Sequence, residues 1–221
     1  MGPDESWQLI EEHRLAIADL LELLTPEEWQ RPSLCTRWRV RDVAAHLAPL
    51  TSAPPVGVMI RAAVRARGNF DRLNHDLAVR HAQQPTSVII SELRQNAGSR
   101  DLPPVTNYRN IMFDVLVHGQ DIAVPLDRTL QFSAAAGSAA VENLWQLRWP
   151  WSTQRRFRGL SFSATDTDWS AGNGPVVRGP IRSLLLVLAG RPAGLSELTG
   201  DGLPELALRI TATPRRPAER T

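Results

Sequence analysis

An aspartate and a histidine four residues apart, Asp114 and His118, lie within and directly after Ile111–Val117, a segment that is otherwise apolar nearly all round. In a helix this separation places both side chains on one face, one turn apart, which is the spacing that a metal ion needs from two ligands on one helix. A carboxylate in a helix that is apolar on all sides carries a large desolvation cost unless a cation or several donors meet it. The pattern therefore predicts a partner for Asp114, either a metal ion or a buried Arg or His side chain.

A second histidine, His46, lies three residues after Val43 and four before Leu50, on the apolar face of a predicted helix. A single inward histidine is more often a core residue than a ligand. In combination with Asp114 and His118 it completes a set of two imidazoles and one carboxylate from two helices. Such a set leaves a fourth coordination position open, as a catalytic zinc site does.

The other candidate residues are interpreted as structural. His13 lies on the apolar stripe of the first helix, whereas His75 and His81 are six apart and point to different faces. Cys35 has no readable relation to a histidine, so we interpret it as a buried structural thiol rather than a nucleophile. Gly172–Gly174 is interpreted as a turn, and the sequence contains no G-x-S-x-G, P-loop or H-E-x-x-H motif.

Composition excludes several classes of protein. The chain has 221 residues, 25 basic and 23 acidic side chains, a formal net charge of +2 and one cysteine. A net charge this small does not indicate a protein that binds nucleic acid. A single cysteine rules out a disulfide within the chain. The start lacks an apolar leader, and the longest apolar run, Leu184–Ala189, is too short to span a bilayer. We expect a cytoplasmic protein that acts on a small molecule, with neither nucleic acid nor membrane as a partner.

Apolar spacings of three, four and seven predict that the first two thirds of the chain is helical. The predicted helices cover about residues 6–24, 40–50, 56–66, 69–83, 86–98, 107–122 and 134–147. After Pro150 the sequence pattern changes. Alternating side chains over Phe157–Ser163 predict a short strand, and the apolar segment Ser183–Ala189 predicts a further helix. We therefore expect a helical bundle over residues 1–150, a small α+β domain over 151–210 and a disordered tail over 211–221.

Two stretches resemble the mycothiol-dependent maleylpyruvate isomerase family, which belongs to the DinB/YfiT-like superfamily of four-helix-bundle metalloenzymes. They are Leu24-Thr-Pro-Glu-Glu-Trp29 with Trp38-Arg-Val-Arg-Asp42-Val-Ala-Ala-His46, and Asp114-Val-Leu-Val-His118-Gly-Gln-Asp121. The resemblance is best over residues 5–148 and extends more loosely to Leu184–Arg191. The family usually has a hydroxyl residue where this chain has Arg39, and Glu where it has Asp114.

The resemblance implies a mainly α fold, a DinB-like four-helix bundle followed by a small α+β domain. It implies a divalent metal ion, zinc, held by His46, Asp114 and His118, with the open position for water or for the thiol of mycothiol, a low-molecular-weight thiol of actinobacteria. Asp121, one turn after His118, would orient that imidazole from behind the ligand shell, where Asp42 would also lie.

The same resemblance implies an enzyme of the isomerase or S-transferase type that acts on a small electrophilic substrate. A thiolate adds to an activated double bond, allows rotation about the resulting single bond, and leaves again. Arg191 would anchor a carboxylate of the substrate or cofactor. The alternative is a bundle without catalytic activity that binds a small molecule or a protein partner, and the departures at Arg39 and Asp114 keep that alternative open.

Overall fold

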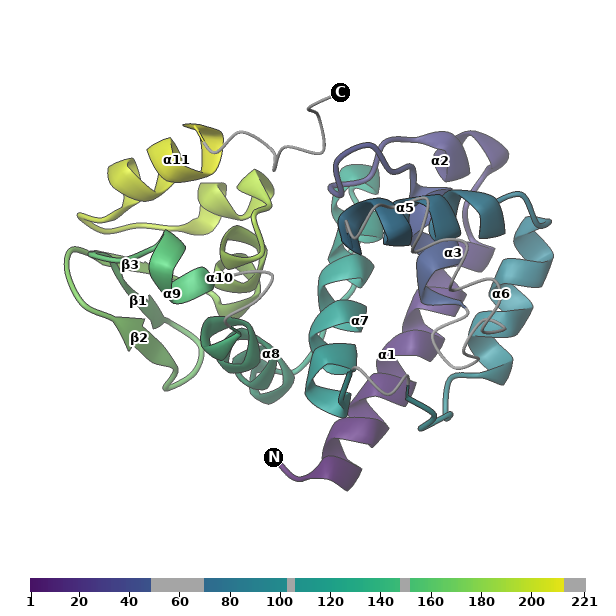
Figure 1. Cartoon of the computed structure of the whole chain (residues 1–221), viewed down its shortest axis with the longest axis horizontal. Helices are drawn as coiled ribbons and strands as arrows, with labels where there is room; N and C mark the ends of the chain where they lie inside the picture. Colours follow the sequence, from purple (N-terminus) through teal and green to yellow (C-terminus); the bar gives the residue numbers. More distant parts are fainter. Residues whose placement is uncertain (49–69, 103–105, 148–151, 213–221) are drawn as a thin grey trace. The chain divides into compact units, whose positions relative to one another are not determined.

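The computed structural model describes residues 1–48, 70–102, 106–147 and 152–212, and the predicted helix over 56–66 lies outside this part of the chain (Figure 1). The elements before residue 130 are helical: α1 (Pro3–Glu22), α2 (Pro26–Gln30), α3 (Val40–Leu47), α5 (Phe70–His81), α6 (Thr86–Gln95), α7 (Tyr108–Ala123) and η1 (Val124–Leu126). The later ones are α8 (Ala134–Gln146), α9 (Thr153–Arg156), β1 (Ser161–Ala164), β2 (Ser170–Gly172), β3 (Val176–Gly179), α10 (Ile181–Leu188), η2 (Pro192–Glu197) and α11 (Leu203–Ala212). The described chain is thus mainly α with one small sheet, as the sequence predicts.

Packing divides the chain into two compact units. Among the described elements, one unit holds α1, α2, α3, α5, α6, the C-terminal part of α7 and η1, and the other holds the N-terminal part of α7 with α8 to α11. Helix α7 is continuous and contributes to both. Helix α8 groups with the strands because it packs against α10. The domain boundary near residue 150 stays a prediction.

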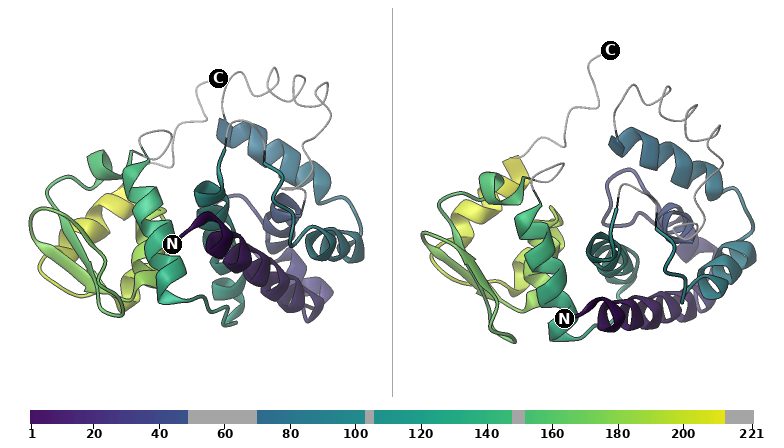
Figure 2. Two further views of the ribbon diagram at one scale, coloured as in Figure 1. Left: turned by 90° about the horizontal axis from the view of Figure 1, so that it is seen from below. Right: turned by 60° about the horizontal axis from the view of Figure 1, so that its bottom comes forward.

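In the helical unit, α1 packs against α6, and α3 packs against α5 and α6 (Figure 2). The predicted apolar stripe of α1 is buried at Trp7, Ile10 and Ile17. The helix ends at Glu22, two residues earlier than predicted, because Thr25 begins α2 with a capping box. In that box Glu28 N–H donates to Thr25 Oγ1 and Thr25 N–H donates to the Glu28 carboxylate.

The other unit is built on a three-stranded sheet of order β2-β1-β3, in which β1 runs antiparallel to β2 and parallel to β3. Helix α10 packs against β1 and β3 (Figure 2). The predicted strand begins four residues late, at Ser161, because Phe157 and Gly159 form a turn after α9. Gly172–Gly174 is the predicted turn, and a Cβ at Gly174 would lie 2.2 Å from the carbonyl oxygen of Gly159.

Histidine 13 belongs to the core of the helical unit, in agreement with its structural interpretation. It is 5% exposed, and its burial lowers its pKa to about 4. A Cβ placed on Gly119 of α7 would lie 2.8 Å from its Nε2 atom, so His13 packs against α7 at Gly119. The imidazole is therefore neutral in the folded protein at neutral pH.

We expect this buried imidazole to make the protein sensitive to acid. Below about pH 6.5 the unfolded chain binds a proton at His13 that the folded chain does not bind until about pH 4. The free energy of unfolding should therefore fall between these pH values, by up to about 3 kcal/mol from this residue. Urea unfolding at pH 7 and at pH 4.5 measures this loss of unfolding free energy. The loss should be smaller in His13→Gln and unchanged in His81→Gln, and an equal loss in all three proteins would contradict the prediction.

Candidate metal centre

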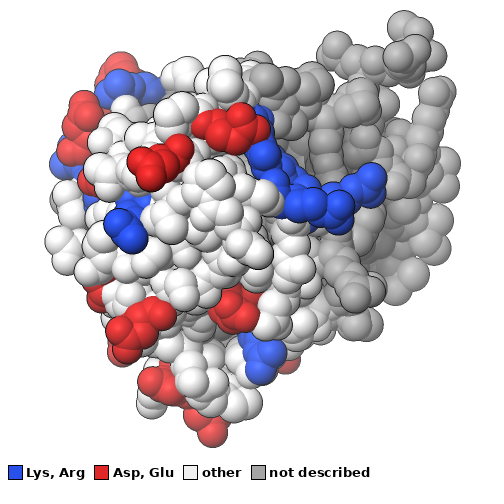
Figure 3. All heavy atoms as spheres, turned by 90° about the vertical axis from the view of Figure 1, so that its left-hand side faces the viewer, with Lys and Arg blue, Asp and Glu red and all other residues white. Residues whose placement is uncertain are grey.

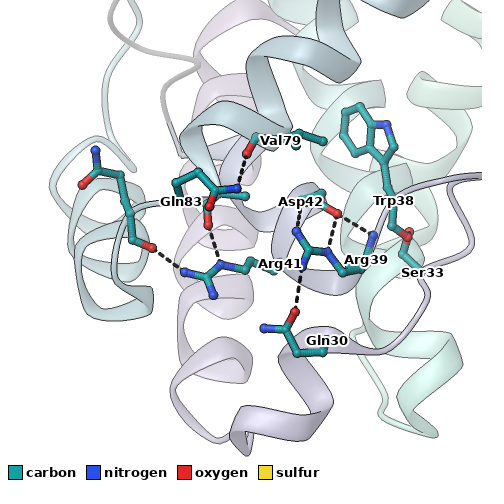
Figure 4. A network of polar contacts seen from close by, with 10 residues as sticks. Gln30, Ser33, Trp38, Arg39, Arg41, Asp42, Val79 and Gln83 are labelled. Atoms are coloured by element: carbon teal, nitrogen blue, oxygen red, sulfur yellow. Dashed lines mark hydrogen bonds and ion pairs between the residues drawn. The ribbon is translucent and has the colours of Figure 1, made fainter.

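The start of α3 is held by a compact ion pair. Asp42 is 2% exposed and accepts hydrogen bonds from the Arg39 backbone N–H and from its guanidinium Nε and Nη2, each at 2.9 Å (Figure 4). Burial alone would raise the pKa of Asp42, but the hydrogen bonds and the charge of Arg39 outweigh it, so the pKa lies below its usual value. Although Arg39 replaces the hydroxyl residue of the family, Asp42 still fixes the helix start one turn before His46.

The loop before α3 is anchored to α7. Ser33 Oγ donates to the carbonyl oxygens of Cys35 and Trp38, and the Leu34 N–H donates to the carbonyl oxygen of Asp121 at 3.1 Å. Arg37 adopts a left-handed conformation with φ of 70° at the tip of this loop. These contacts place Trp38 and Cys35 beside the C-terminal half of α7.

Three imidazole rings surround the indole of Trp38. The His118 ring stacks on it with a centroid distance of 5.9 Å and an interplanar angle of 9°. The His46 and His75 rings lie 5.2 and 6.2 Å from it. The His46 and His118 centroids are 5.0 Å apart, so the structure brings together the two histidines that the sequence predicts to face each other.

The three predicted ligands converge. One ligand atom each from His46, Asp114 and His118 lies within 4.8 Å of the others, and all three residues are half-buried. Two atoms bound to zinc at a tetrahedral angle are about 3.3 Å apart, so the set closes on an ion with no more than about 1.5 Å of side-chain movement. Two imidazoles, one carboxylate and an open position are the donors of a catalytic zinc site, and the residues therefore fit the metal that the family resemblance implies.

Asp121 lies behind this set. It is completely buried, and its Oδ2 atom lies 2.8 Å from Nδ1 of His118. A carboxylate at Nδ1 holds the imidazole proton there and leaves Nε2 to face a metal ion. The contact supports the role predicted for Asp121, whereas the hydrogen bonds of Asp42 go to Arg39.

We expect Asp121→Asn to weaken zinc binding by about 10–100-fold, since loss of a carboxylate that orients a ligating histidine has effects of this size. The matched control is Glu92→Gln, which alters the carboxylate of a second His–carboxylate pair, 2.6 Å from His81 Nε2. Competition with a chromogenic chelator measures both affinities. Equal zinc affinity in Asp121→Asn and in the control would contradict the predicted role.

Two neighbours of this site were not predicted. His75 packs on Trp38, a contact that its sequence position did not indicate, and Cys35 is half-buried with its thiol close to His118 and Asp121. The path of the 32–39 loop cannot be read from the periodicity of the sequence, so the spacing of residues gave no sign that Cys35 lies here.

Arg191 is 8% exposed, and its Nη1 donates to the carbonyl oxygen of Ala189 at 2.7 Å. Its role as a carboxylate anchor stays a prediction.

The surface and the C-terminal unit add little to this assignment. Acidic and basic side chains are interspersed on the face drawn in Figure 3, as the balanced composition predicts. Among the described residues no helix combines the length and the apolar character that crossing a membrane requires. An open hollow of about 510 Å³ lies in the C-terminal unit between Trp145, Phe157 and Arg158. Its lining includes none of the predicted ligands.

The fold and the site define a helical-bundle protein with a candidate mononuclear metal centre and a small α+β unit. Residues 10–101, which include His46, match the family model of the mycothiol maleylpyruvate isomerase N-terminal domain. The match shows that this part of the chain is similar to that N-terminal domain. None of the curated proteins matches the chain.

Two solved structures share the fold over nearly the whole chain. The crystal structure of a mycothiol-dependent maleylpyruvate isomerase has a TM-score of 0.58 and 13% identity, with 91% of this chain and 93% of that chain covered. A histidine-to-alanine mutant of a mycothiol-dependent maleylpyruvate isomerase has a TM-score of 0.57 and 14% identity with the same coverage. At this identity the likeness establishes the shared, mainly α fold alone.

Proposed function

We propose that the protein is a metal-dependent enzyme that uses a low-molecular-weight thiol, mycothiol, in an isomerase or S-transferase reaction on a small electrophile. The observation that carries the proposal is the convergence of His46, Asp114 and His118 within 4.8 Å, with the buried Asp121 at Nδ1 of His118. The domain family of residues 10–101 supports the choice of thiol. A cytoplasmic location, where small thiols stay reduced, is part of the proposal.

The charge of the ligand set favours a thiolate in the open position. Two neutral imidazoles and the Asp114 carboxylate offset one of the two charges of zinc, so one positive charge remains for an anionic fourth ligand. A bound zinc ion would lower the pKa of a coordinated thiol and supply a thiolate nucleophile at neutral pH.

The residues of the chain prepare this position. Asp121 holds the proton of His118 at Nδ1, and the 8% exposed Trp38 shields the stacked face of His118 from water. His46, Asp114 and His118 themselves stay half-buried, which leaves access for a thiol and a substrate. A substrate whose double bond is activated by a carbonyl group would accept the thiolate and become an enolate with a single bond at that position. After rotation about this bond, the enolate would expel the thiolate and re-form the double bond as the isomer.

A second candidate is a bundle that binds a small molecule without catalysis. The shorter carboxylate of Asp114 favours it, because the loss of one methylene moves the ligand oxygens by more than about 1 Å. The two candidates differ in turnover, since both allow a small molecule to bind.

The decisive experiment uses protein purified without an affinity tag. Metal content is measured first, and conversion of maleylpyruvate is then measured with and without mycothiol. We expect about one zinc per chain and conversion only with the thiol, and we expect His46→Ala to lose the thiol-dependent conversion. Zinc without thiol-dependent conversion would favour the second candidate, and protein that binds no divalent metal would overturn the proposal.

A further inference from the structure

A second group of metal-binding side chains shares His118 with the first. Ligand atoms of Cys35, His118 and Asp121 lie within 4.8 Å of one another. Cys35 is the only cysteine of the chain and is half-buried, whereas Asp121 is completely buried. A soft thiolate, an imidazole and a carboxylate are a donor set that thiophilic divalent ions accept.

The backbone holds Cys35 in this position. Its N–H donates to Ser33 Oγ at 3.1 Å, and its carbonyl oxygen accepts from the Trp38 N–H at 3.0 Å. The neighbouring Leu34 N–H donates to the carbonyl oxygen of Asp121, which ties the loop to α7. Cys35 and Asp121 therefore keep a fixed separation although they come from distant parts of the sequence.

The two groups share the imidazole ring of His118. His118 Nδ1 faces Asp121 Oδ2 at 2.8 Å, which leaves Nε2 for the group with His46 and Asp114. We propose that Cys35, His118 Nδ1 and Asp121 form a second cation position, selective for thiophilic divalent ions such as Cd²⁺. Its thiolate and carboxylate offset both charges of such an ion, whereas the first group offsets only one.

Binding at this position requires a small rearrangement. Two atoms that ligate one ion at about 2 Å are about 3.3 Å apart, so the contact between Nδ1 and Oδ2 opens by about 0.5 Å. The Cys35 thiol releases one proton to solvent, and the His118 proton moves from Nδ1 to Nε2. Because Nε2 then carries a proton, His118 cannot ligate a second ion with His46 and Asp114. The two positions should therefore exclude each other.

The test is a titration of the full chain with Cd²⁺ in a buffer without thiols. Binding is monitored by the thiolate-to-metal charge-transfer absorption in the near ultraviolet. Because the chain has one cysteine, this absorption reports Cys35 alone. We expect it to saturate at one ion per chain and to disappear in Cys35→Ser. The apparent affinity should fall at least about 10-fold in His118→Ala and stay within about 2-fold in His46→Ala.

Each variant also carries an outcome that overturns the inference. If His118→Ala bound Cd²⁺ with undiminished affinity, Cys35 would hold the ion without the help of His118. Loss of absorption in His46→Ala would make Cys35 a fourth ligand of the first group, and absorption that rises with protein concentration would place the ion between two chains. Zinc binding by Cys35→Ser tests the proposed function separately, since that variant keeps His46, Asp114 and His118.

Discussion

Replacing His118 with alanine should abolish tight binding of zinc and leave the helical fold intact. His118 belongs to both groups of metal-binding side chains, and no other residue of α7 presents an imidazole to His46. Loss of a residue that merely orients a ligand costs about 10–100-fold in affinity, so loss of the ligand itself should exceed about 100-fold. The zinc content of purified protein and chelator competition measure the effect.

The fold should survive because burial of apolar surface, not metal, dominates the stability of a chain of this length. The matched control is His81→Ala, which removes a histidine of the same unit that pairs with Glu92. Circular dichroism should show the same helical content in both variants. Normal zinc content in His118→Ala would remove this residue from the ligand set, and with it the proposed metal centre.

The helices that position the candidate ligands were predictable because their apolar residues recur with the period of a helix. Val43, Ile111 and Val115 are buried, so the side chains at His46 and His118 had to share the interior side of their helices. Periodicity also showed that a carboxylate and an imidazole one turn apart in α7 require a partner. What it did not show is how the donors meet, since their distances depend on how α3 and α7 pack.

The unpredicted features depend on loops and on tertiary contacts. The 32–39 loop reaches Asp121 through a backbone hydrogen bond from Leu34, which no pattern of side chains reports. Arg14 lies within the predicted first helix, but the apolar spacing gave no sign that it is 2% exposed and donates to the carbonyl oxygens of Ala97 and Ser99 beyond the end of α6. Strand β3 was missed because it is short and gains its stability from parallel pairing with β1.

Asp114→Asn should weaken zinc binding steeply while the size of the side chain stays the same. The carboxylate is the one charged donor of the first ligand set, so its loss removes the charge that offsets part of the zinc dication. We expect a fall in affinity of at least about 10-fold, as for other ligand changes. The control is Asp19→Asn, an exposed carboxylate that pairs with Arg94. Zinc affinity of that variant should be unchanged.

If Asp114 instead stabilises the fold as the partner of a buried cation, the same substitution acts on stability. Loss of one member of a fully buried pair costs about 3–5 kcal/mol, and the half-buried position of Asp114 sets a smaller cost. Thermal unfolding of the apo protein separates the two roles. An Asp114→Asn protein that binds zinc normally but unfolds at a much lower temperature would show that this carboxylate belongs to a core ion pair.

Asp114→Glu completes the test because it restores the longer side chain of the family. The Asp114 oxygen lies within 4.8 Å of the His46 and His118 nitrogens, and a glutamate at this position keeps the carboxylate charge that offsets part of the zinc dication. Zinc affinity should therefore be retained or increased in this variant. If Asp114 instead belongs to a buried ion pair without a metal ion, the added methylene would overpack the site and lower the free energy of unfolding by about 1–3 kcal/mol. Tighter zinc binding by Glu than by Asp, together with weaker binding by Asn, is a pattern that only a metal-ligating carboxylate produces.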